Sequence, residues 1–252
     1  MTGERRSWRV AAIAMPVALV ALVALLAVEV QLARGGARLE GAPLDLDGRV
    51  GGAGTPLRVV WLGDSTAAGV GVDDAVDALP TVVAAALGRP VELTVLAVSG
   101  DRIGDVLADQ VPAADPVEGA VAADVVFVSI GANDVTHLTS RDDFTGRYRT
   151  LVDRLPAGAE VVLLGVPDMG ALPRLAQPLR AVTGLRGRQL DEVVREVAAE
   201  AGATYVPIAA ATGPTFRAEP GRMFADDDYH PSAAGYRLWA DAVVAEVADL
   251  VR

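Results

Sequence analysis

The chain has 252 residues and is 52% hydrophobic, which suffices for one globular domain with a sizeable core and an additional segment. Its formal net charge of −11 argues against nucleic acid as a partner, because phosphate binding needs a basic surface. The absence of cysteine excludes disulfides, thiolate metal sites and cysteine nucleophiles, and any imidazole chemistry must use His137 or His230, the two histidines.

The N-terminal region carries a long apolar run. Residues 10–28 contain no charge, and these 19 positions are long enough to cross a bilayer core as one helix. A secretory signal has a shorter apolar region and a small-residue cleavage site, so the pattern favours an uncleaved transmembrane anchor; a cleaved signal and a buried core helix are the alternatives. Arg5, Arg6 and Arg9 precede the run, and positive charge marks the cytoplasmic side. We therefore expect a cytoplasmic basic segment at 1–9 and an extracytoplasmic location for the rest of the chain.

Residues 29–56 are rich in Gly, Ala and Pro, which predicts a flexible linker before a domain at 57–252. In that domain, apolar strands alternate with amphipathic segments. Strands are expected at 58–62, 92–98, 125–130, 160–166 and 204–207, and helices at 77–87, 103–110, 144–155, 185–201 and 232–251. Such strands, separated by helices, indicate a parallel sheet of about five strands in a three-layer α/β/α domain.

Four polar or glycine-containing stretches follow strands or precede the last predicted helix. They are Gly63-Asp64-Ser65 with Gly69, Val98-Ser99-Gly100-Asp101-Arg102, Gly131-Ala132-Asn133-Asp134 and Asp227-Asp228-Tyr229-His230-Pro231. In a parallel sheet, the strand ends that lead into helices lie along one edge. We therefore expect these four loops to converge on one crevice.

The converging residues match the needs of acyl transfer at a serine. Ser65 supplies a hydroxyl nucleophile, His230 a base that titrates near neutral pH, and Asp227 a carboxylate that orients the imidazole. The backbone N–H of Ser65, the backbone N–H of Gly100 and the side-chain amide of Asn133 are the natural donors to an oxyanion. The sequence thus predicts a Ser-His-Asp site with an oxyanion hole.

The combination of GDS, a lone glycine after the second strand, GxND and DxxHP, in this order, resembles the SGNH hydrolases, also called the GDSL esterase/lipase family. The resemblance covers residues 57–245 and implies a flavodoxin-like three-layer fold. It also implies Ser65 as nucleophile, Asp227 and His230 as its partners, Gly100 and Asn133 as oxyanion donors, and no cofactor. The first motif reads GDST instead of GDSL, and residues 94–97 lack an asparagine that often precedes the glycine. The GxSxG elbow of α/β-hydrolases does not occur.

Each site residue also has a purely structural alternative. Ser65 could cap a helix, His230 could merely precede one, and Asn133 could close the turn after its glycine. Asp226 and Asp228 flank Asp227, which we favour because it lies three residues before the histidine.

The remaining polar residues of these loops are given structural roles. Asp64 and Asp134 are expected to organise their loops through hydrogen bonds to nearby groups. His137 is expected at the rim of the pocket, and Arg102 as an exposed side chain that could meet an anionic group. Residues 172–183 contain two prolines without a clear period and are a candidate lid or pocket wall.

Together these features predict a membrane-anchored, extracytoplasmic serine esterase that hydrolyses lipid or acylated-glycan esters through an acyl-enzyme. One alternative is an acyltransferase that passes the acyl group to a sugar or glycerol hydroxyl. Another is a catalytically inactive domain that binds envelope glycans. The sequence contains no signal for an oligomeric state.

Overall fold

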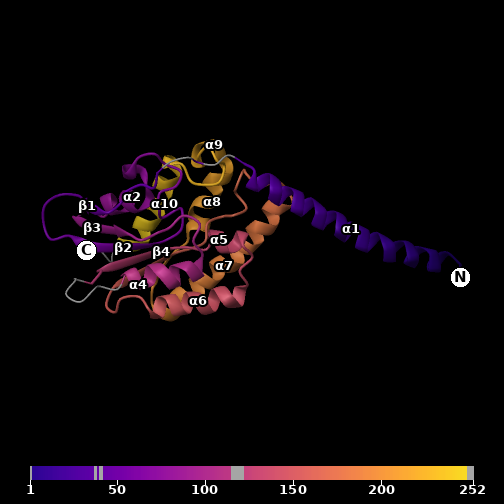
Figure 1. Cartoon of the computed structure of the whole chain (residues 1–252), viewed down its shortest axis with the longest axis horizontal. Coiled ribbons are helices and arrows are strands. Elements are labelled where there is room, and N and C mark those ends of the chain that lie inside the picture. The colour runs from indigo at the N-terminus through magenta and orange to yellow at the C-terminus, as the bar shows by residue number, and fades with distance from the viewer. Residues whose placement is uncertain (1, 37–38, 40–41, 115–121, 249–252) are drawn as a thin grey trace.

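The computed structural model describes residues 2–36, 39, 42–114 and 122–248. They form a long N-terminal helix and a domain built around one sheet (Figure 1). Residues 37–38 and 40–41 of the predicted linker, and 249–251 of the last predicted helix, lie outside the described residues.

The sheet has six strands within the described residues, in the order β1-β3-β2-β4-β5-β6. The strands are β1 (Gly48–Val50), β2 (Leu57–Gly63), β3 (Val91–Val95), β4 (Val125–Ser129), β5 (Glu160–Leu164) and β6 (Thr204–Val206). All neighbouring pairs are parallel except β1 and β3, which are antiparallel. Every residue of β4 is buried, because helices cover both faces of the sheet. The predicted α/β/α fold is confirmed, and an edge strand adds to the five predicted ones.

The helices form two layers, one on each face of the sheet (Figure 1). The first layer holds α2 (Leu79–Ala86), α8 (Ile208–Ala218), α9 (Pro220–Met223) and α10 (Ala233–Val247). The second holds α3 (Ile103–Asp105), the π-helical turn η2 (Val106–Gln110), α4 (Val111–Ala114), α6 (Arg141–Asp153) and α7 (Leu179–Ala201). The short elements η1 (Ala75–Asp77) and α5 (Ala132–Thr136) lie in the connections.

Aromatic packing joins the two central strands. Trp61 of β2 and Phe127 of β4 are register partners, and their rings stack with centroids 4.4 Å apart and planes 9° from parallel. Both side chains are completely buried. Stacked aromatic pairs of this kind add to the stabilisation from burial, so the strand that precedes Ser65 is held rigidly.

Part of the predicted linker belongs to the domain, which corrects the expectation of a flexible segment over 29–56. Strand β1 pairs with β3, the Asp47 carboxylate accepts the Val95 N–H at 2.7 Å, and Leu46 is buried. Three residues in a Gly-rich stretch are too few to show a strand period. The first part of the predicted linker is helical, because α1 continues to Arg34.

Several helix boundaries differ from the predicted ones. Helix α7 starts six residues earlier than expected, and α5, α8 and α9 had no predicted counterpart. Helix α8 contains Gly213 and Pro214, both unfavourable in a helix interior, so its sequence shows no helical signal. Tertiary packing stabilises it instead, because Ile208 and Phe216 are buried.

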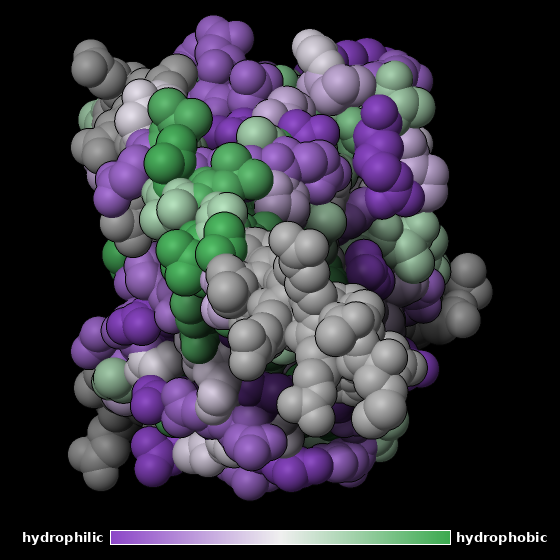
Figure 2. Space-filling model, turned by 90° about the vertical axis from the view of Figure 1, so that its right-hand side faces the viewer, coloured by the Kyte–Doolittle hydropathy of each residue, from purple (hydrophilic) through white to green (hydrophobic). Residues whose placement is uncertain are grey.

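Helix α1 (Thr2–Arg34) projects away from the domain (Figure 1). Its segment Met15–Ala33 is long and apolar enough to cross a membrane, a property that a signal sequence near the N-terminus shares. Figure 2, seen from the side of α1, shows a green apolar stripe against a mostly hydrophilic surface. Among the exposed apolar side chains of α1 are Met15, Val20 and Leu32.

Candidate active site

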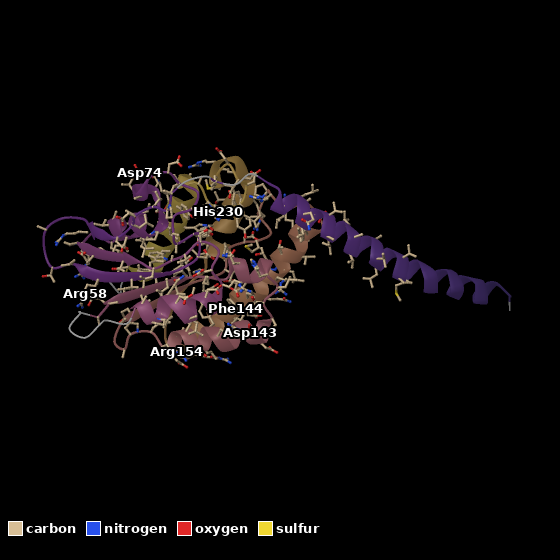
Figure 3. The ribbon with its side chains drawn as sticks, viewed as in Figure 1. Arg58, Asp74, Asp143, Phe144, Arg154 and His230 are labelled. Atoms are coloured by element: carbon tan, nitrogen blue, oxygen red, sulfur yellow. The ribbon has the colours of Figure 1, made fainter. Side chains whose placement is uncertain are left out.

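The loops predicted to converge lie at the carboxyl end of the parallel strands. Ser65 is the second residue after β2, and His230 lies in the loop before α10. Figure 3 shows His230 at this end of the sheet and Arg58, near the start of β2, at the opposite end. Gly63 ends β2 so close to β4 that a Cβ at this position would collide with the Ser129 carbonyl oxygen. Glycine is therefore required immediately before the turn that carries Ser65.

Ser65, His230 and Asp227 form one hydrogen-bonded series. The Ser65 Oγ lies 3.0 Å from His230 Nε2, and His230 Nδ1 lies 2.6 Å from Asp227 Oδ2. Asp227 Oδ1 accepts the backbone N–H groups of Tyr229 at 3.0 Å and His230 at 2.9 Å. A carboxylate fixed in this way keeps the imidazole proton on Nδ1, so that Nε2 faces the serine as an acceptor.

The environment of Asp227 keeps its carboxyl group ionised. Burial works to raise the pKa of Asp227, but hydrogen bonds from the His230 ring and from nearby backbone N–H groups outweigh it and hold the pKa below its ordinary value. The side chain is only 4% exposed, whereas the flanking Asp226 and Asp228 are exposed. Of the three adjacent aspartates, Asp227 is thus the one that can stabilise a charged imidazole.

A second buried carboxyl group lies beside the serine. Asp64 is 2% exposed, and its Oδ1 accepts the N–H of Thr66 at 3.0 Å and the Thr66 hydroxyl at 2.9 Å. Burial raises the pKa of Asp64 to about 6. The expected role of Asp64 in organising its loop matches these two contacts.

The raised pKa of Asp64 predicts a pH-dependent stability. Because the pKa in the folded protein exceeds 3.8, the folded state binds this proton more tightly than the unfolded chain. Protonated Asp64 therefore contributes to the free energy of unfolding. This contribution is complete below about pH 4 and is lost as the pH rises through about 6, a change of at most about 3 kcal/mol. Asp64→Asn keeps an acceptor oxygen but cannot ionise, so its Tm is expected to rise relative to the wild type between about pH 4 and pH 7. Thermal melts of both proteins at the two pH values measure this change, and a constant Tm difference contradicts it.

Three donors are available for an oxyanion. The backbone N–H groups of Ser65 and Gly100 have no acceptor among the described residues. Gly100 is exposed and has a φ of +95°, a conformation that favours glycine. Asn133 is half-buried, and its amide donates to the Asp101 carbonyl oxygen at 2.9 Å. One amide hydrogen thus joins α5 to the turn that carries Gly100, and the second remains for a ligand.

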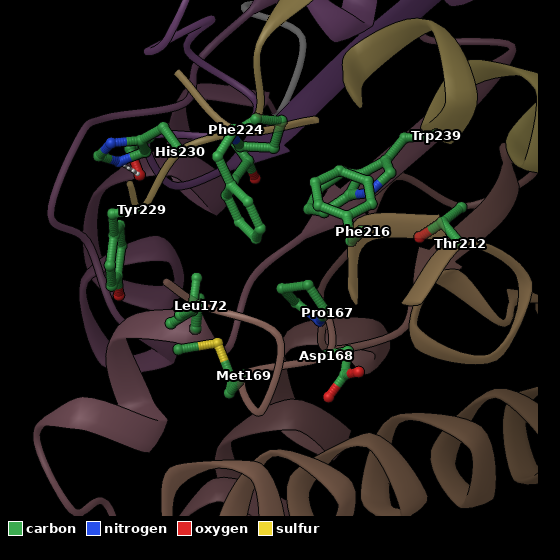
Figure 4. Close-up of a pocket in the computed structure, with 14 residues that line it drawn as sticks. Pro167, Asp168, Met169, Leu172, Thr212, Phe216, Phe224, Tyr229, His230 and Trp239 are labelled. Atoms are coloured by element: carbon green, nitrogen blue, oxygen red, sulfur yellow. Dashed lines mark hydrogen bonds between the residues drawn. The ribbon is translucent and has the colours of Figure 1, made fainter. Parts of the chain in front are cut away.

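An apolar cavity opens beside Ser65 and His230, with a volume of about 30 Å³. Figure 4 shows His230 at one end of it and Trp239 with Phe216 at the other. Leu172 forms part of the wall, so one end of the 172–183 segment lines the pocket. Space of this size admits about two water-sized groups, and its walls favour a hydrocarbon moiety.

The sequence comparisons decide the family. Residues 61–238 match the GDSL-like Lipase/Acylhydrolase family. The chain belongs to this family. It is also 35% identical over 198 residues to a GDSL-like esterase of Mycobacterium tuberculosis, and the match covers 77% of this chain and 62% of that relative. The resemblance to the SGNH hydrolases is thereby confirmed.

Solved structures of a phospholipase and an esterase share the fold. A phospholipase A1 from Streptomyces albidoflavus aligns with a TM-score of 0.60 at 23% identity, over 76% of this chain and all of its own. An acetyl xylan esterase from Geobacillus stearothermophilus aligns with a TM-score of 0.58 at 21% identity, over 77% of this chain and 95% of its own. At these identities the likeness concerns the fold alone.

Gln110, which no sequence motif singled out, supports the site. Its buried side-chain amide accepts the Gly63 N–H and donates to the Gly63 carbonyl oxygen, both at 2.8 Å, and also donates to the Asp101 carboxylate at 2.8 Å. Gln110 thus ties the end of β2 to the turn with Gly100. The available signal was a glutamine seven residues after Ile103, on the apolar face of a predicted helix. This segment is a π-helical turn, a feature frequent at functional sites.

The other polar loop residues lie around the site. Asp134 is buried and accepts the Ile103 N–H at 3.0 Å and the Thr139 hydroxyl at 2.8 Å, in line with a loop-organising role. His137 is exposed, with Nδ1 2.9 Å from the carbonyl oxygen of Asn133. Arg102 is paired with the nearby Asp105, at 3.6 Å. No group of three or more potential metal ligands occurs among the described residues.

Proposed function

We propose that the chain is a membrane-anchored serine esterase that hydrolyses carboxylic esters through an acyl-enzyme intermediate. The observation that carries the proposal is the series of Ser65, His230 and Asp227 beside an apolar cavity. Membership of the GDSL-like lipase/acylhydrolase family supports the same chemistry. A glycan-binding module would have no use for a serine hydroxyl held against an imidazole with an ionised carboxylate behind it.

The proposed reaction has two acyl-transfer steps. As Ser65 Oγ adds to the ester carbonyl carbon, His230 Nε2 takes the hydroxyl proton and then gives it to the departing alcohol. Water attacks the resulting acyl-serine, transfers a proton to the same nitrogen, and the proton returns to Ser65 Oγ as the acid leaves. Asp227 keeps the required tautomer and stabilises the imidazolium in both steps.

The oxyanion of each tetrahedral intermediate is assigned to the N–H groups of Ser65 and Gly100 and the amide of Asn133. Asn133→Ala removes one donor, so we expect kcat to fall by about 10²–10³-fold. His137→Ala, a control at the C-terminal end of α5, is expected to retain turnover, because the proposed base is the other histidine. Steady-state kinetics with one ester measures both variants. A wild-type rate in Asn133→Ala contradicts the donor assignment.

Helix α1 is proposed to be an uncleaved anchor that places the domain outside the cytoplasm. Its apolar segment is long enough to span a bilayer, and Arg5, Arg6 and Arg9 precede that segment. The C-terminal end of α1 also contacts the domain, since the buried Glu29 carboxylate accepts the Leu179 N–H at 2.9 Å. Cleavage of α1 as a signal would forfeit this contact.

The cavity supports a substrate with a small apolar acyl group. About 30 Å³ bounded by groups such as Leu172, Phe216 and Trp239 accommodates a short hydrocarbon chain better than a long one. The similar proteins named above include a phospholipase and an acetyl xylan esterase, so lipid and acylated-glycan esters are the substrate classes to compare.

A series of p-nitrophenyl esters from acetate to decanoate, given to the full chain in detergent micelles, tests the proposed activity. We expect turnover with the shortest esters and a decline as the acyl chain lengthens. Transfer of the acyl group to added glycerol or sugar in place of water would reassign the enzyme as an acyltransferase. Absence of turnover throughout the series would contradict the proposed esterase activity.

A further inference from the structure

The C-terminal end of α1 is attached to the domain through the start of α7. Glu29 is 6% exposed although it lies in the apolar part of α1, and its carboxylate accepts the N–H of Leu179, the first residue of α7. Helix α7 has no side-chain cap from its own preceding residue, Pro178. A carboxylate at a helix N-terminus satisfies an unpaired N–H and interacts favourably with the helix dipole. Helix α1 therefore supplies the cap that α7 lacks.

Arg174 extends this attachment to the catalytic loop. Its Nε donates to the Ala33 carbonyl oxygen at 2.7 Å, in the last turn of α1, and its Nη1 donates to the Asp227 carbonyl oxygen at 3.2 Å. The backbone N–H of Arg174 also donates to the Asp228 carbonyl oxygen, at 3.2 Å. One rigid, planar guanidinium thus joins the C-terminal end of α1, where cations are favoured, to the residue whose carboxylate faces His230.

The loop held by Arg174 has a conformation that needs support. Asp228 has a φ of +56°, in the left-handed region that residues other than glycine adopt at a cost. Such a conformation persists only where neighbouring contacts hold it in place. Two bonds from Arg174 end on the carbonyl groups of Asp227 and Asp228, so they act at the point where the chain turns toward His230.

We propose that Arg174 is a positioning residue, through which the docked end of α1 holds the Asp227 loop in its catalytic geometry. The proposal rests on the proposed function, because it assigns Asp227 its role beside His230. Activity then depends on the junction between α1 and the domain, in addition to the residues around the pocket. A shift of about 1 Å in a catalytic group can cost up to about 10²-fold in rate.

Variants of the full chain in lipid nanodiscs test this positioning. Arg174→Ala is expected to lower kcat about 10- to 100-fold while KM stays nearly constant, because the pocket itself is unchanged. Arg174→Lys is expected to retain an intermediate kcat, since one ammonium cannot reproduce the planar fork. Arg58→Ala is the matched control: it removes a half-buried arginine that pairs with Asp124 at the opposite end of the sheet. It should lower Tm without changing kcat.

A second variant perturbs Arg174 from the α1 side. A Cβ added at Gly36 would lie 2.8 Å from Arg174 Cζ and 2.9 Å from its Nε, so Gly36→Ala forces the guanidinium to move. We expect Gly36→Ala to lower kcat several-fold with KM nearly constant, although residue 36 lies outside the pocket lining. A wild-type kcat in both Gly36→Ala and Arg174→Ala would overturn the proposal.

A spectroscopic readout separates this inference from the proposed activity. The 2.6 Å contact between His230 Nδ1 and Asp227 Oδ2 predicts a low-field proton resonance in the NMR spectrum. The signal should weaken or shift in Arg174→Ala and stay unchanged in Arg58→Ala, whether or not the wild type cleaves a given ester. An unchanged signal in Arg174→Ala overturns the positioning role. If the wild type cleaves no ester but the signal still changes in Arg174→Ala, only the esterase proposal is contradicted.

Discussion

Replacing Ser65 with alanine is expected to lower kcat by several orders of magnitude, up to about 10⁶-fold, as when a serine hydrolase loses its nucleophile. The hydroxyl lies 3.0 Å from His230 Nε2, so its removal takes away both the attacking atom and the proton that the imidazole accepts. KM should change little, because the apolar cavity remains. Steady-state kinetics on a short p-nitrophenyl ester measures both constants.

Ser140→Ala is the matched control for this substitution. Ser140 caps α6 by accepting the Asp143 N–H at 3.1 Å, and α6 lies in the helix layer on one face of the sheet. Its loss should cost about 1 kcal/mol of stability and leave kcat unchanged. If Ser65→Ala retained more than about a tenth of the wild-type rate, another nucleophile would have to carry the reaction.

Asp227→Asn is expected to lower kcat by about 10⁴-fold, with little loss of structure. An asparagine oxygen can still accept the backbone N–H groups of Tyr229 and His230. Its amide nitrogen would then face His230 Nδ1 and donate to it. The imidazole proton would move to Nε2, which could no longer accept the proton of Ser65. The fall should therefore appear in kcat and kcat/KM together.

The two flanking aspartates provide the controls for this variant. Asp226 and Asp228 are exposed, and asparagine tolerates the left-handed conformation of residue 228. Both Asp226→Asn and Asp228→Asn should keep kcat within a few-fold of the wild type. A larger loss in either flanking variant than in Asp227→Asn would contradict the assignment of the carboxylate.

The sequence predicted those parts of the fold that show a strong local period. Strand β4 and the second half of β2 are buried on both faces and therefore appear as continuous apolar runs, ending at Ser129 and Gly63. The site could be anticipated because polar residues follow these runs, and parallel strands place such residues at one edge. The spacing of three residues also singled out Asp227, whose carboxylate reaches His230 in the structure.

The parts that the sequence did not predict depend on long-range contacts. Strand β1 exists because it pairs with β3, and α8 because its apolar residues pack against the domain despite Pro214. Gln110 and Arg174 bind backbone carbonyl groups far away in the chain, at Gly63 and Ala33. A backbone carbonyl has no sequence signature, so such contacts become visible only in the folded structure.

Labelling of the full chain with a fluorophosphonate probe, followed by mass-spectrometric mapping of the modified peptide, tests whether Ser65 is an activated nucleophile. The probe forms a covalent bond with an activated serine and needs no knowledge of the natural ester. We expect one adduct on Ser65, formed rapidly by the wild type, slowly by His230→Ala and not at all by Ser65→Ala. An adduct on another residue, or no adduct on the folded wild-type protein, would contradict a serine hydrolase with Ser65 as its nucleophile.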